Sequence, residues 1–504
     1  MENQSPKPIH CKAAVCRAAG EPLIIEEIVV DPPKAYEIRI KIICTSLCHT
    51  DISFWQAKVA PVFPRILGHE AYGVVESVGQ HVEGFVTGDA VVPVSLGQCD
   101  HCPSCLSEHS NLCTSVPLTM APGMRRDGTT RFRDAQGNPV HDLLALSTFS
   151  EYTVVDMNQV VKLDPAVPPK LACLLSCGAS TGVGAAWKLA KVERGSSVAI
   201  FGLGSVGLAV AQGAKMCGAS KIIGVDLNPD KEKVGKTFGV TDFVNPTKLD
   251  KSSVIEVIGE MTGGGVDCSF ECIGVPSVMT DAFRSTKLGN GKTIVLGMGK
   301  ETDQLCVPAL ELLFGRSIIG SALGGIKPKT DIPIIAEKCM NKELELDGLV
   351  THEVGLGEIN TAFDLMLQGK SLRCIIWMGD SEADRRWRRL RLRVHRRVVG
   401  DDRCLHKHQT GQGQDDHPGL GEGQRASLPA VPGPPVRQVR HGLLLRRDEA
   451  QDRRPNPRPK MHEQGCYIYI KHDQFRVTIW EHACSADVFV QTRAGVGAGR
   501  AGDA

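Results

Sequence analysis

Four cysteines lie close together in the string GQCDHCPSCLSEHSNLC, with the spacing C-x2-C-x2-C-x7-C. They are Cys99, Cys102, Cys105 and Cys113. Tight turns at this spacing let four thiolates converge on one tetrahedral Zn²⁺, and a site closed by four thiolates is structural. The sequence therefore predicts a structural zinc site in a segment covering residues 97–115, which we call the cysteine lobe.

A second set of metal-ligating side chains is dispersed along the chain outside the lobe. Cys48, the adjacent pair His69 and Glu70, and Cys177 provide three candidate ligands far apart in sequence. Three protein ligands leave one coordination position open for water or substrate, as in catalytic zinc sites. The two sets together predict one structural and one catalytic zinc ion.

A glycine-rich string, Gly202-x-Gly204-x-x-Gly207, follows the apolar segment SVAIF and begins a helical pattern. This context is typical of a dinucleotide-binding loop, in which the pyrophosphate approaches the backbone and the helix N-terminus. Asp226 ends the next apolar segment, KIIGVD. Its carboxylate would accept hydrogen bonds from the adenosine ribose and repel a 2′-phosphate, which favours NAD over NADP.

The elements that must position these residues fall into two kinds. Before about residue 178, short apolar segments separated by Gly and Pro predict an irregular, mostly β domain. From about residue 179, apolar strands alternate with helical segments, which predicts a doubly wound parallel sheet. The string GEINTAFDLMLQGKSLRCIIWM, ending at Met378, predicts a helix and then a strand.

Composition excludes several classes of protein. The chain has 504 residues and a formal net charge of +1, which gives no global argument for nucleic acid or membrane binding. It has no apolar run of transmembrane length, and its first residues do not resemble a signal peptide. Its 19 cysteines without such a signal indicate a reducing compartment, and we expect a cytoplasmic protein.

The chain changes character after Met378. Residues 379–504 hold 20 Arg and 3 Lys, whereas residues 1–378 hold 11 Arg and 24 Lys. Three interpretations are a basic arm that binds nucleic acid or acidic partners, a disordered extension, and an Arg-rich segment produced by out-of-frame or read-through translation. The abrupt exchange of Lys for Arg favours the third. Only CYIYIKHDQFRVTIW alternates enough to indicate strands.

The motifs CHTD, GHE, the cysteine lobe, LLSCGASTGVGAA and GLGSVG occur in this order. With them the chain resembles the zinc-containing medium-chain alcohol dehydrogenases, and among these the plant alcohol dehydrogenase-like proteins. The resemblance covers about residues 9–378. It implies a GroES-like catalytic domain (1–178 and 321–378) around a Rossmann NAD-binding domain (179–320), two zinc ions per subunit, and a homodimer formed largely through the coenzyme domains.

The resemblance also assigns roles to single residues. Cys48, His69 and Cys177 match the catalytic zinc ligands, Thr50 the residue that takes the alcohol proton, and Asp51 the acceptor that orients His69. Glu70 lies behind the metal in the family. The resemblance implies that the coenzyme contacts come from Gly202, Leu203, Gly204, Ser205, Val206, Gly207, Asp226, Lys231 and Arg373. His49 is a further candidate for the pyrophosphate, although a solvated loop histidine explains it nearly as well.

Departures from the family pattern concern the proton relay and the substrate pocket. Relatives often carry His or Tyr where Ser53 stands, an aromatic residue where Ser95 stands, and Phe where Leu143 stands. Since Ser95 and Leu143 remove volume from a pocket that also includes Thr50 and His69, we expect a preference for alcohols bulkier than ethanol. Pro117 stands where glutathione-dependent formaldehyde dehydrogenases carry an Arg.

The sequence therefore predicts an NAD-dependent zinc enzyme that interconverts small-molecule alcohols and aldehydes or ketones. Two alternative functions are compatible with the sequence. One is an S-(hydroxymethyl)glutathione dehydrogenase, for which Arg125 and Arg126 could replace the missing Arg. The other is a protein that binds NAD and zinc without turnover.

Overall fold

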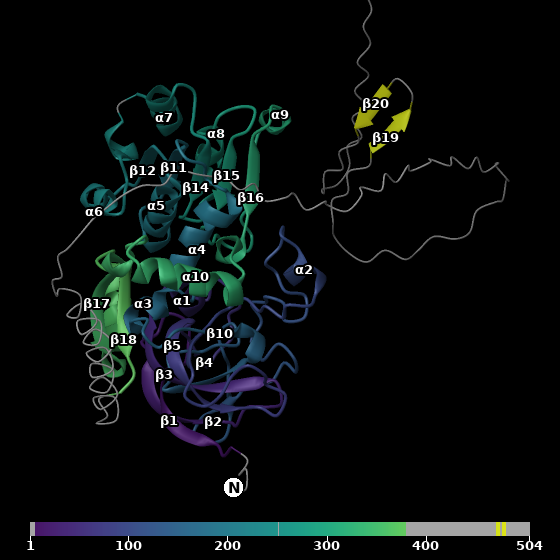
Figure 1. Ribbon diagram of the computed structural model, residues 1–504, viewed down its shortest axis with the longest axis vertical. Coiled ribbons are helices and arrows are strands. Elements are labelled where there is room, and N and C mark those ends of the chain that lie inside the picture. The colour runs from purple at the N-terminus through teal and green to yellow at the C-terminus, as the bar shows by residue number, and fades with distance from the viewer. Residues whose placement is uncertain (1–5, 250, 380–469, 474–475, 480–504) are drawn as a thin grey trace, which may run out of the picture. The chain divides into compact units, whose positions relative to one another are not determined.

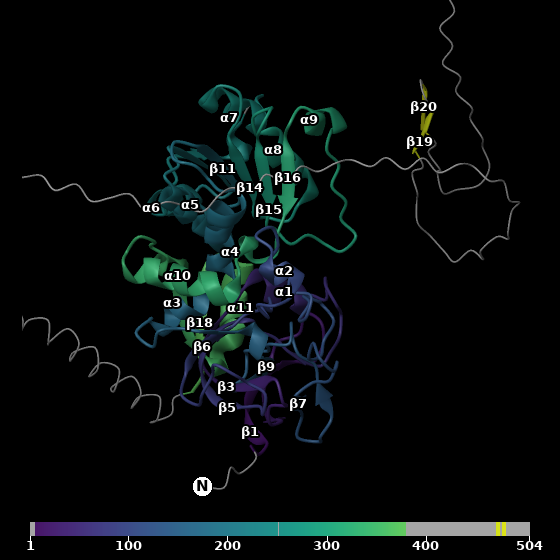
Figure 2. The same ribbon diagram turned by 45° about the vertical axis from the view of Figure 1, so that its right-hand side comes forward.

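The computed structural model describes residues 6–249, 251–379, 470–473 and 476–479. Its first compact unit contains three sheets, and the figures show one sheet above the other two, with helices between them (Figures 1 and 2). The second unit, which begins at Gly413, contains one described hairpin, β19 (Ile470–Asp473) paired with β20 (Arg476–Ile479). That hairpin lies where alternation predicted strands. The prediction that the rest of 379–504 is unstructured falls almost entirely outside the described residues.

The N-terminal part of the chain forms two mostly antiparallel sheets. The first has the order β4 (Arg65–Ile66), β1 (Ile9–Cys16), β2 (Ile24–Val30), β7 (Phe132–Arg133) and β8 (Pro139–Val140). The second has the order β10 (Val160–Lys162), β6 (Ala90–Pro93), β5 (Glu70–Val78), β3 (Glu37–Ser46), β18 (Arg373–Trp377) and β17 (Val350–Gly355), with β9 (Tyr152–Asp156) also on β3. The short strands expected here are confirmed as an irregular, mostly β domain.

The third sheet is parallel throughout. Its order is β13 (Asp242–Val244), β12 (Lys221–Val225), β11 (Ser197–Phe201), β14 (Cys268–Glu271), β15 (Lys292–Val295) and β16 (Ser317–Gly320). The chain reverses its direction of progress across the sheet between β11 and β14, and such a switch point is where ligands bind in doubly wound folds. The predicted Rossmann sheet is therefore confirmed, with β13 as an additional edge strand.

Helices cover the parallel sheet and line the boundary between the two halves (Figure 1). Those of the Rossmann part are α5 (Ser205–Cys217), α6 (Lys231–Thr237), α7 (Val254–Thr262), α8 (Pro276–Arg284) and α9 (Ala309–Leu313). The others are α1 (His49–Trp55), α2 (Pro103–Leu106), α3 (Pro169–Leu174), α4 (Gly178–Gly184), α10 (Pro328–Met340) and α11 (Ile359–Leu367). The largest hydrophobic core joins residues of both halves, so the Rossmann sheet and the β domain share packing around α4 and α5.

Local sequence explains where several of these helices begin and end. α7 is capped by Ser253, whose hydroxyl accepts from the backbone N–H of Glu256 while the Glu256 carboxylate accepts from the N–H of Ser253. α5 is terminated by the following residue, Gly218, which adopts the left-handed conformation with φ 87°. In the part of the chain that the structure describes, every helix is too short or too polar to cross a membrane.

Candidate active site and metal centres

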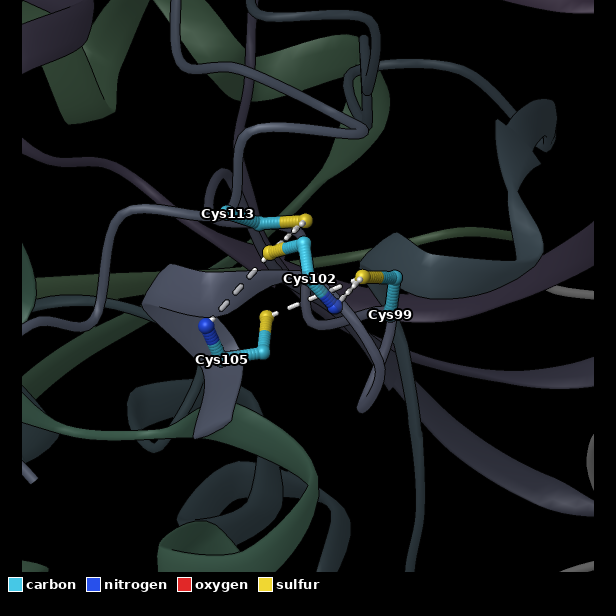
Figure 3. A group of neighbouring side chains, drawn as sticks. All are labelled: Cys99, Cys102, Cys105 and Cys113. Atoms are coloured by element: carbon cyan, nitrogen blue, oxygen red, sulfur yellow. Dashed lines mark hydrogen bonds between the residues drawn. The ribbon is translucent and has the colours of Figure 1, made fainter. Parts of the chain in front are cut away.

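The four lobe cysteines converge on one point, as the sequence predicted (Figure 3). Their Sγ atoms all lie within 4.8 Å of one another. Cys99 Sγ lies 3.9 Å from Cys105 Sγ, and Cys102 Sγ lies 4.0 Å from Cys113 Sγ. Since four sulfurs at these separations can surround a single ion at Zn–S distances near 2.3 Å, the cluster fits a tetrahedral Zn²⁺.

Backbone N–H groups of the lobe point at the sulfurs and favour their thiolate form. Cys102 N donates to Cys99 Sγ at 3.3 Å, Cys105 N to Cys102 Sγ at 3.4 Å, and Val116 N to Cys113 Sγ at 3.4 Å. Hydrogen bonds to the charged form of a group stabilise that form. The short helix α2, which begins after Cys102 with Pro103 at its first position, gives the turn its geometry.

A second cluster brings together Cys48, His69, Glu70 and Cys177. Their ligand atoms also lie within 4.8 Å of one another. Cys48 precedes α1, His69 and Glu70 stand at the start of β5, and Cys177 precedes α4. Three separate elements therefore deliver one histidine, two cysteines and one carboxylate to a common site at the boundary between the two halves of the unit.

The position of His69 indicates that this cluster is built for a metal. Asp51 Oδ1 lies 2.9 Å from His69 Nδ1, which fixes the ring with Nε2 toward the cluster. Nε2 is buried and has no hydrogen-bond partner among the described residues. An orphaned ring nitrogen beside two cysteine sulfurs fits a Zn²⁺ ligand, because the metal would replace the missing partner.

We expect the substitution Asp51→Asn to weaken metal binding at this cluster by about 10–100-fold, the usual effect of losing the acceptor behind a metal-bound histidine. Asp51 also accepts from the backbone N–H groups of Cys48 and Gly68, both at 3.0 Å, so the amide would disturb two ligand-bearing turns as well. The measurement is zinc transfer to a chromogenic chelator.

The matched control for this substitution is Asp134→Asn. Asp134 is also buried and also accepts backbone N–H groups, from Gln136 and Asn138. It lies in the turn between β7 and β8 and is not part of either cysteine cluster. Equal rates of zinc loss in the two variants would refute the role given to Asp51.

Arg373 provides the counter-charge of the second cluster. Its guanidinium donates to both Glu70 carboxylate oxygens at 3.0 Å and to Cys48 Sγ at 3.4 Å, and it also contacts the Ser205 hydroxyl. Burial opposes the charge of Arg373, but the Glu70 carboxylate raises its pKa, so it remains a cation. The resemblance implied that Arg373 contacts the coenzyme; here it joins the cluster to the first residue of α5.

The electrostatic surroundings of Cys48 favour a thiolate. Its contact with the Cys177 thiol lowers the pKa of Cys48 well below the usual value, burial opposes this shift, and the Arg373 guanidinium adds to it. Thiolates rather than thiols bind zinc. The contact with Cys48 and burial raise the pKa of the Cys177 thiol well above the usual value, so binding of a metal would release the proton of this second sulfur.

The remaining predicted site residues lie on α1 and in loops of the β domain. Thr50 is half-buried on α1, one turn before Ser53, whose hydroxyl donates to the carbonyl of His49 at 3.2 Å. Leu143 is fully buried, whereas Ser95, just after β6, is half-buried.

The glycine-rich loop has the geometry of a dinucleotide cradle. Gly202 has φ 93°, and a Cβ on Gly207 would lie 1.9 Å from the carbonyl oxygen of Gly202, so both positions require glycine. A Cβ on Gly204 would meet no atom of the described chain within 4 Å. That open space at the start of α5, beside helix N–H groups, fits a pyrophosphate.

The other predicted coenzyme residues of the Rossmann part lie in this loop, at the starts of α5 and α6, and just after β12. Leu203, Ser205 and Val206 belong to the turn and the first residues of α5, and Lys231 begins α6. Asp226 Oδ2 accepts from the backbone N–H of Leu203 at 2.8 Å, which places its carboxylate at the edge of the cradle.

Two contacts of the second cluster were not predicted. Ser46 donates its hydroxyl to Glu70 Oε2 at 2.7 Å, and Gly178 donates its backbone N–H to Glu70 Oε1 at 3.1 Å. Glu70 therefore holds β3, β5, β18 and the start of α4 together. No sequence signal marks these contacts, because the partners lie far apart in the chain and carry no motif of their own.

Two family models match the chain. The model described as "Alcohol dehydrogenase GroES-like domain" matches residues 34–165, and the one described as "Zinc-binding dehydrogenase" matches residues 205–340. The first lies in the β domain with the lobe and with Cys48 and His69. The second covers most of the parallel sheet and, from Ser205 onward, the last part of its glycine-rich loop.

Proteins of this family are similar over most of the chain. "Alcohol dehydrogenase-like 5" of Arabidopsis thaliana is 57% identical over 376 residues, which are 74% of this chain and 97% of the relative. "Alcohol dehydrogenase 2" of Solanum lycopersicum is 51% identical over 374 residues, 74% of this chain and 98% of the relative. Both relatives match the chain over nearly their whole length.

A solved structure of an alcohol dehydrogenase is also similar to this chain. Benzyl alcohol dehydrogenase from Acinetobacter calcoaceticus superimposes with a TM-score of 0.66 at 30% identity, covering 74% of this chain and all of that one. The family's cofactors, zinc and a nicotinamide dinucleotide, correspond to the two clusters and to the glycine-rich cradle described above. The chain therefore belongs to the zinc-binding medium-chain alcohol dehydrogenases.

Proposed function

We propose that this enzyme oxidises alcohols larger than ethanol with NAD, and that the cluster around Cys48, His69 and Cys177 is its catalytic centre. The observation that carries the proposal is the orphaned, Asp51-oriented Nε2 of His69 beside the two cysteine sulfurs. Zinc supplies a Lewis acid that lowers the pKa of an alcohol, and NAD supplies the hydride acceptor.

In this proposal residues of the chain orient a metal ligand, balance the charge of the cluster and accept the proton of the substrate. Asp51 holds the His69 ring, and Arg373 balances the charge of Glu70 and Cys48. Thr50, two residues after a ligand, accepts the proton of the substrate hydroxyl. Ser53 has no pKa near neutrality, so the proton leaves through water rather than through a titrating side chain.

The preference for larger alcohols is supported by Ser95 and Leu143. Both are smaller than the aromatic residues expected there from the family, and Leu143 is fully buried, so its size bears directly on packing. The structural likeness to an enzyme named for benzyl alcohol agrees with a roomy pocket.

The test is a panel of primary alcohols from ethanol to hexanol, with benzyl alcohol, assayed with NAD on protein of known zinc content. We expect kcat/KM to rise with alcohol size, and Leu143→Phe to shift the optimum toward smaller alcohols. A maximum at ethanol would refute the preference for larger alcohols. NAD binding without turnover of any alcohol would refute catalysis and leave a binding protein.

The structure gives little support to glutathione adducts as substrates. Arg126 is paired with Asp156 and lies over the Tyr36 ring, with its guanidinium carbon 4.4 Å from the ring centroid. Arg125 donates to the carbonyl groups of Thr119 and Ala121. Neither guanidinium is therefore poised for a substrate carboxylate. Oxidation of S-(hydroxymethyl)glutathione but of no simple alcohol would reverse this conclusion.

Asp226 supports the choice of NAD over NADP. We expect Asp226→Ser to raise the NADP-to-NAD ratio of kcat/KM by about 10²-fold, because charge repulsion near the ribose amounts to a few kcal/mol. Kinetics with both coenzymes measure the ratio. Asp230→Ser, an exposed acid four residues later, is the control and should leave the ratio unchanged.

We also propose a homodimer formed through the Rossmann parts. In the described structure β16 pairs only with β15, so one side of β16 is a sheet edge. Large apolar side chains on and near α9 are exposed: Leu288, Leu310, Leu312, Leu313 and Phe314. A second copy would cover both features. Sedimentation equilibrium should give twice the chain mass, and a monomer at micromolar concentration would contradict this.

We further propose the boundaries of the two domains and the location of the protein. The domain boundaries are 1–178 with 321–378 for the catalytic domain and 179–320 for the NAD-binding domain. The location is the cytoplasm, since the cysteines of the described chain are free thiols, which a reducing compartment preserves. Fluorescent tagging and limited proteolysis test them.

A further inference from the structure

We propose that the cysteine lobe positions the catalytic cluster, and that Asn111 and Lys327 are the positioning residues that connect the two. The connection passes through one short turn, η4 (Ala322–Gly325), which links β16 to α10. The inference rests on the proposed function for its activity readout, but its geometry is independent of any substrate.

Asn111 binds the backbone on both sides of η4. Its Nδ2 donates to the carbonyl oxygens of Ala322, at 2.7 Å, and of Ile326, at 3.1 Å. Asn111 lies two residues before the lobe cysteine Cys113. The Asn111 side chain of the lobe therefore binds Ala322, the first residue of η4, and Ile326, the residue that follows η4.

Lys327, which follows η4 in the chain, donates a hydrogen bond back to the lobe. Its Nζ donates to the carbonyl oxygen of Cys105 at 2.8 Å. Cys105 is one of the four cysteines whose sulfurs form the structural cluster. The lobe and η4 are thus joined by polar contacts in both directions, and one of these ends on the backbone of a metal-ligand residue.

The backbone of η4 needs such support. Leu323 has φ 52° and ψ 30°, and the two glycines that follow it, Gly324 and Gly325, have φ 60° and 76°. A leucine in the left-handed region is uncommon and persists when the surroundings fix it. The two hydrogen bonds from Asn111 act on the carbonyl groups that flank this stretch.

Besides its contacts with the lobe, η4 packs tightly against α4. A Cβ on Gly324 would lie 2.1 Å from the carbonyl oxygen of Thr181, and one on Gly184 would lie 2.4 Å from Ile326 Cγ1. Thr181 in turn donates its backbone N–H, at 2.9 Å, and its hydroxyl, at 2.8 Å, to the carbonyl oxygen of Cys177. A shift of η4 would therefore move the residue that carries a ligand of the catalytic cluster.

The test compares the full-length proteins carrying Asn111→Ala, Lys327→Met and His109→Ala with the unsubstituted protein. His109 is exposed and lies in the same lobe, two residues before Asn111, so it is the matched control. The readouts are zinc content, kcat/KM for an alcohol, and the absorption bands of Co²⁺ substituted at the catalytic cluster.

We expect the Asn111→Ala protein to keep two metal ions, to lose about 10–100-fold in kcat/KM, and to show shifted Co²⁺ bands, as for loss of a group that supports a metal ligand. His109→Ala should match the unsubstituted protein. If Asn111→Ala does not fold, Lys327→Met, which retains the aliphatic stem, carries the same expectation with a smaller loss.

Unchanged Co²⁺ bands and kcat/KM within twofold, accompanied only by a lower unfolding temperature, would overturn the inference and leave a structural role. If the unsubstituted protein oxidises no alcohol, the proposed function fails, but the Co²⁺ bands still decide whether the lobe acts on the cluster.

Discussion

The substitution Cys177→Ser should lower kcat for alcohol oxidation by about 10³-fold or more. A serine hydroxyl is a far weaker zinc ligand than a thiolate, and the electrophilic contribution of the metal to the transition state is worth several kcal/mol. The variant protein should contain one zinc ion per chain instead of two. Steady-state kinetics and metal analysis of the same preparation measure both effects.

A matched control for Cys177→Ser exists four residues earlier in the chain. Cys173 is fully buried, whereas Cys177 is half-buried, and the Cys173 Sγ donates to the carbonyl oxygen of Glu70 at 3.3 Å and is not part of the metal cluster. A serine at position 173 can still donate that bond, so Cys173→Ser should keep both zinc ions and most of the activity. Comparable losses in the two variants would show that the cysteine-rich region is merely sensitive to substitution.

Replacing Cys113 with serine should destabilise the fold more than any other substitution considered for the lobe. Structural zinc sites contribute on the order of 10 kcal/mol to the folding of the segments that bind them. The apolar cluster that the lobe forms is small and consists of the four cysteines with Val116. Without the metal, little other packing would hold the segment.

We expect Cys113→Ser protein to unfold at a temperature lower by roughly 10 °C or more, because each kcal/mol moves the transition by about 2–4 °C in domains of this size. Calorimetry and zinc analysis check the result. Cys306→Ser, at an exposed cysteine outside both clusters, is the control. A Cys113→Ser protein with two zinc ions and an unchanged transition would contradict a structural metal at this site.

Structural features that depend on a short stretch of sequence could be predicted from the sequence alone. The cysteine lobe and the glycine-rich loop each depend on spacing within about fifteen residues, and local backbone geometry then fixes the arrangement. Five strands of the parallel sheet were also predictable, because buried parallel strands are short, continuous apolar runs. β13 has one fully buried residue, Val244, and gives a weaker signal.

Long-range contacts could not be predicted in the same way. Arg373 and Glu70 are 303 positions apart, and nothing in the string SLRCIIWM indicates a buried ion pair. The strand around Arg373 was predictable, but its pairing with β3 was not, because pairing depends on which apolar faces meet after collapse. β17, with the mixed string VTHEVG, carries no clear alternation and was not predicted.

The place of β18 in its sheet determines the order in which the protein can be completed during synthesis. Domains fold largely as units while the chain leaves the ribosome. The contiguous Rossmann sheet can close as soon as β16 has emerged. The last residues of β3, Cys44 to Ser46, pair with β18 and must wait for residues 373–377. A chain that stalls before this point presents an unpaired strand edge, which favours aggregation.

The same strand delivers Arg373, so sheet closure and charge balance of the catalytic cluster occur in one late step. Until that step Glu70 has no cation, although His69 and Cys48 are already in place on earlier elements. We therefore compare chains that end before residue 377 with chains that extend beyond it. Their dependence on chaperones and their tendency to accumulate as premature-termination products should differ abruptly.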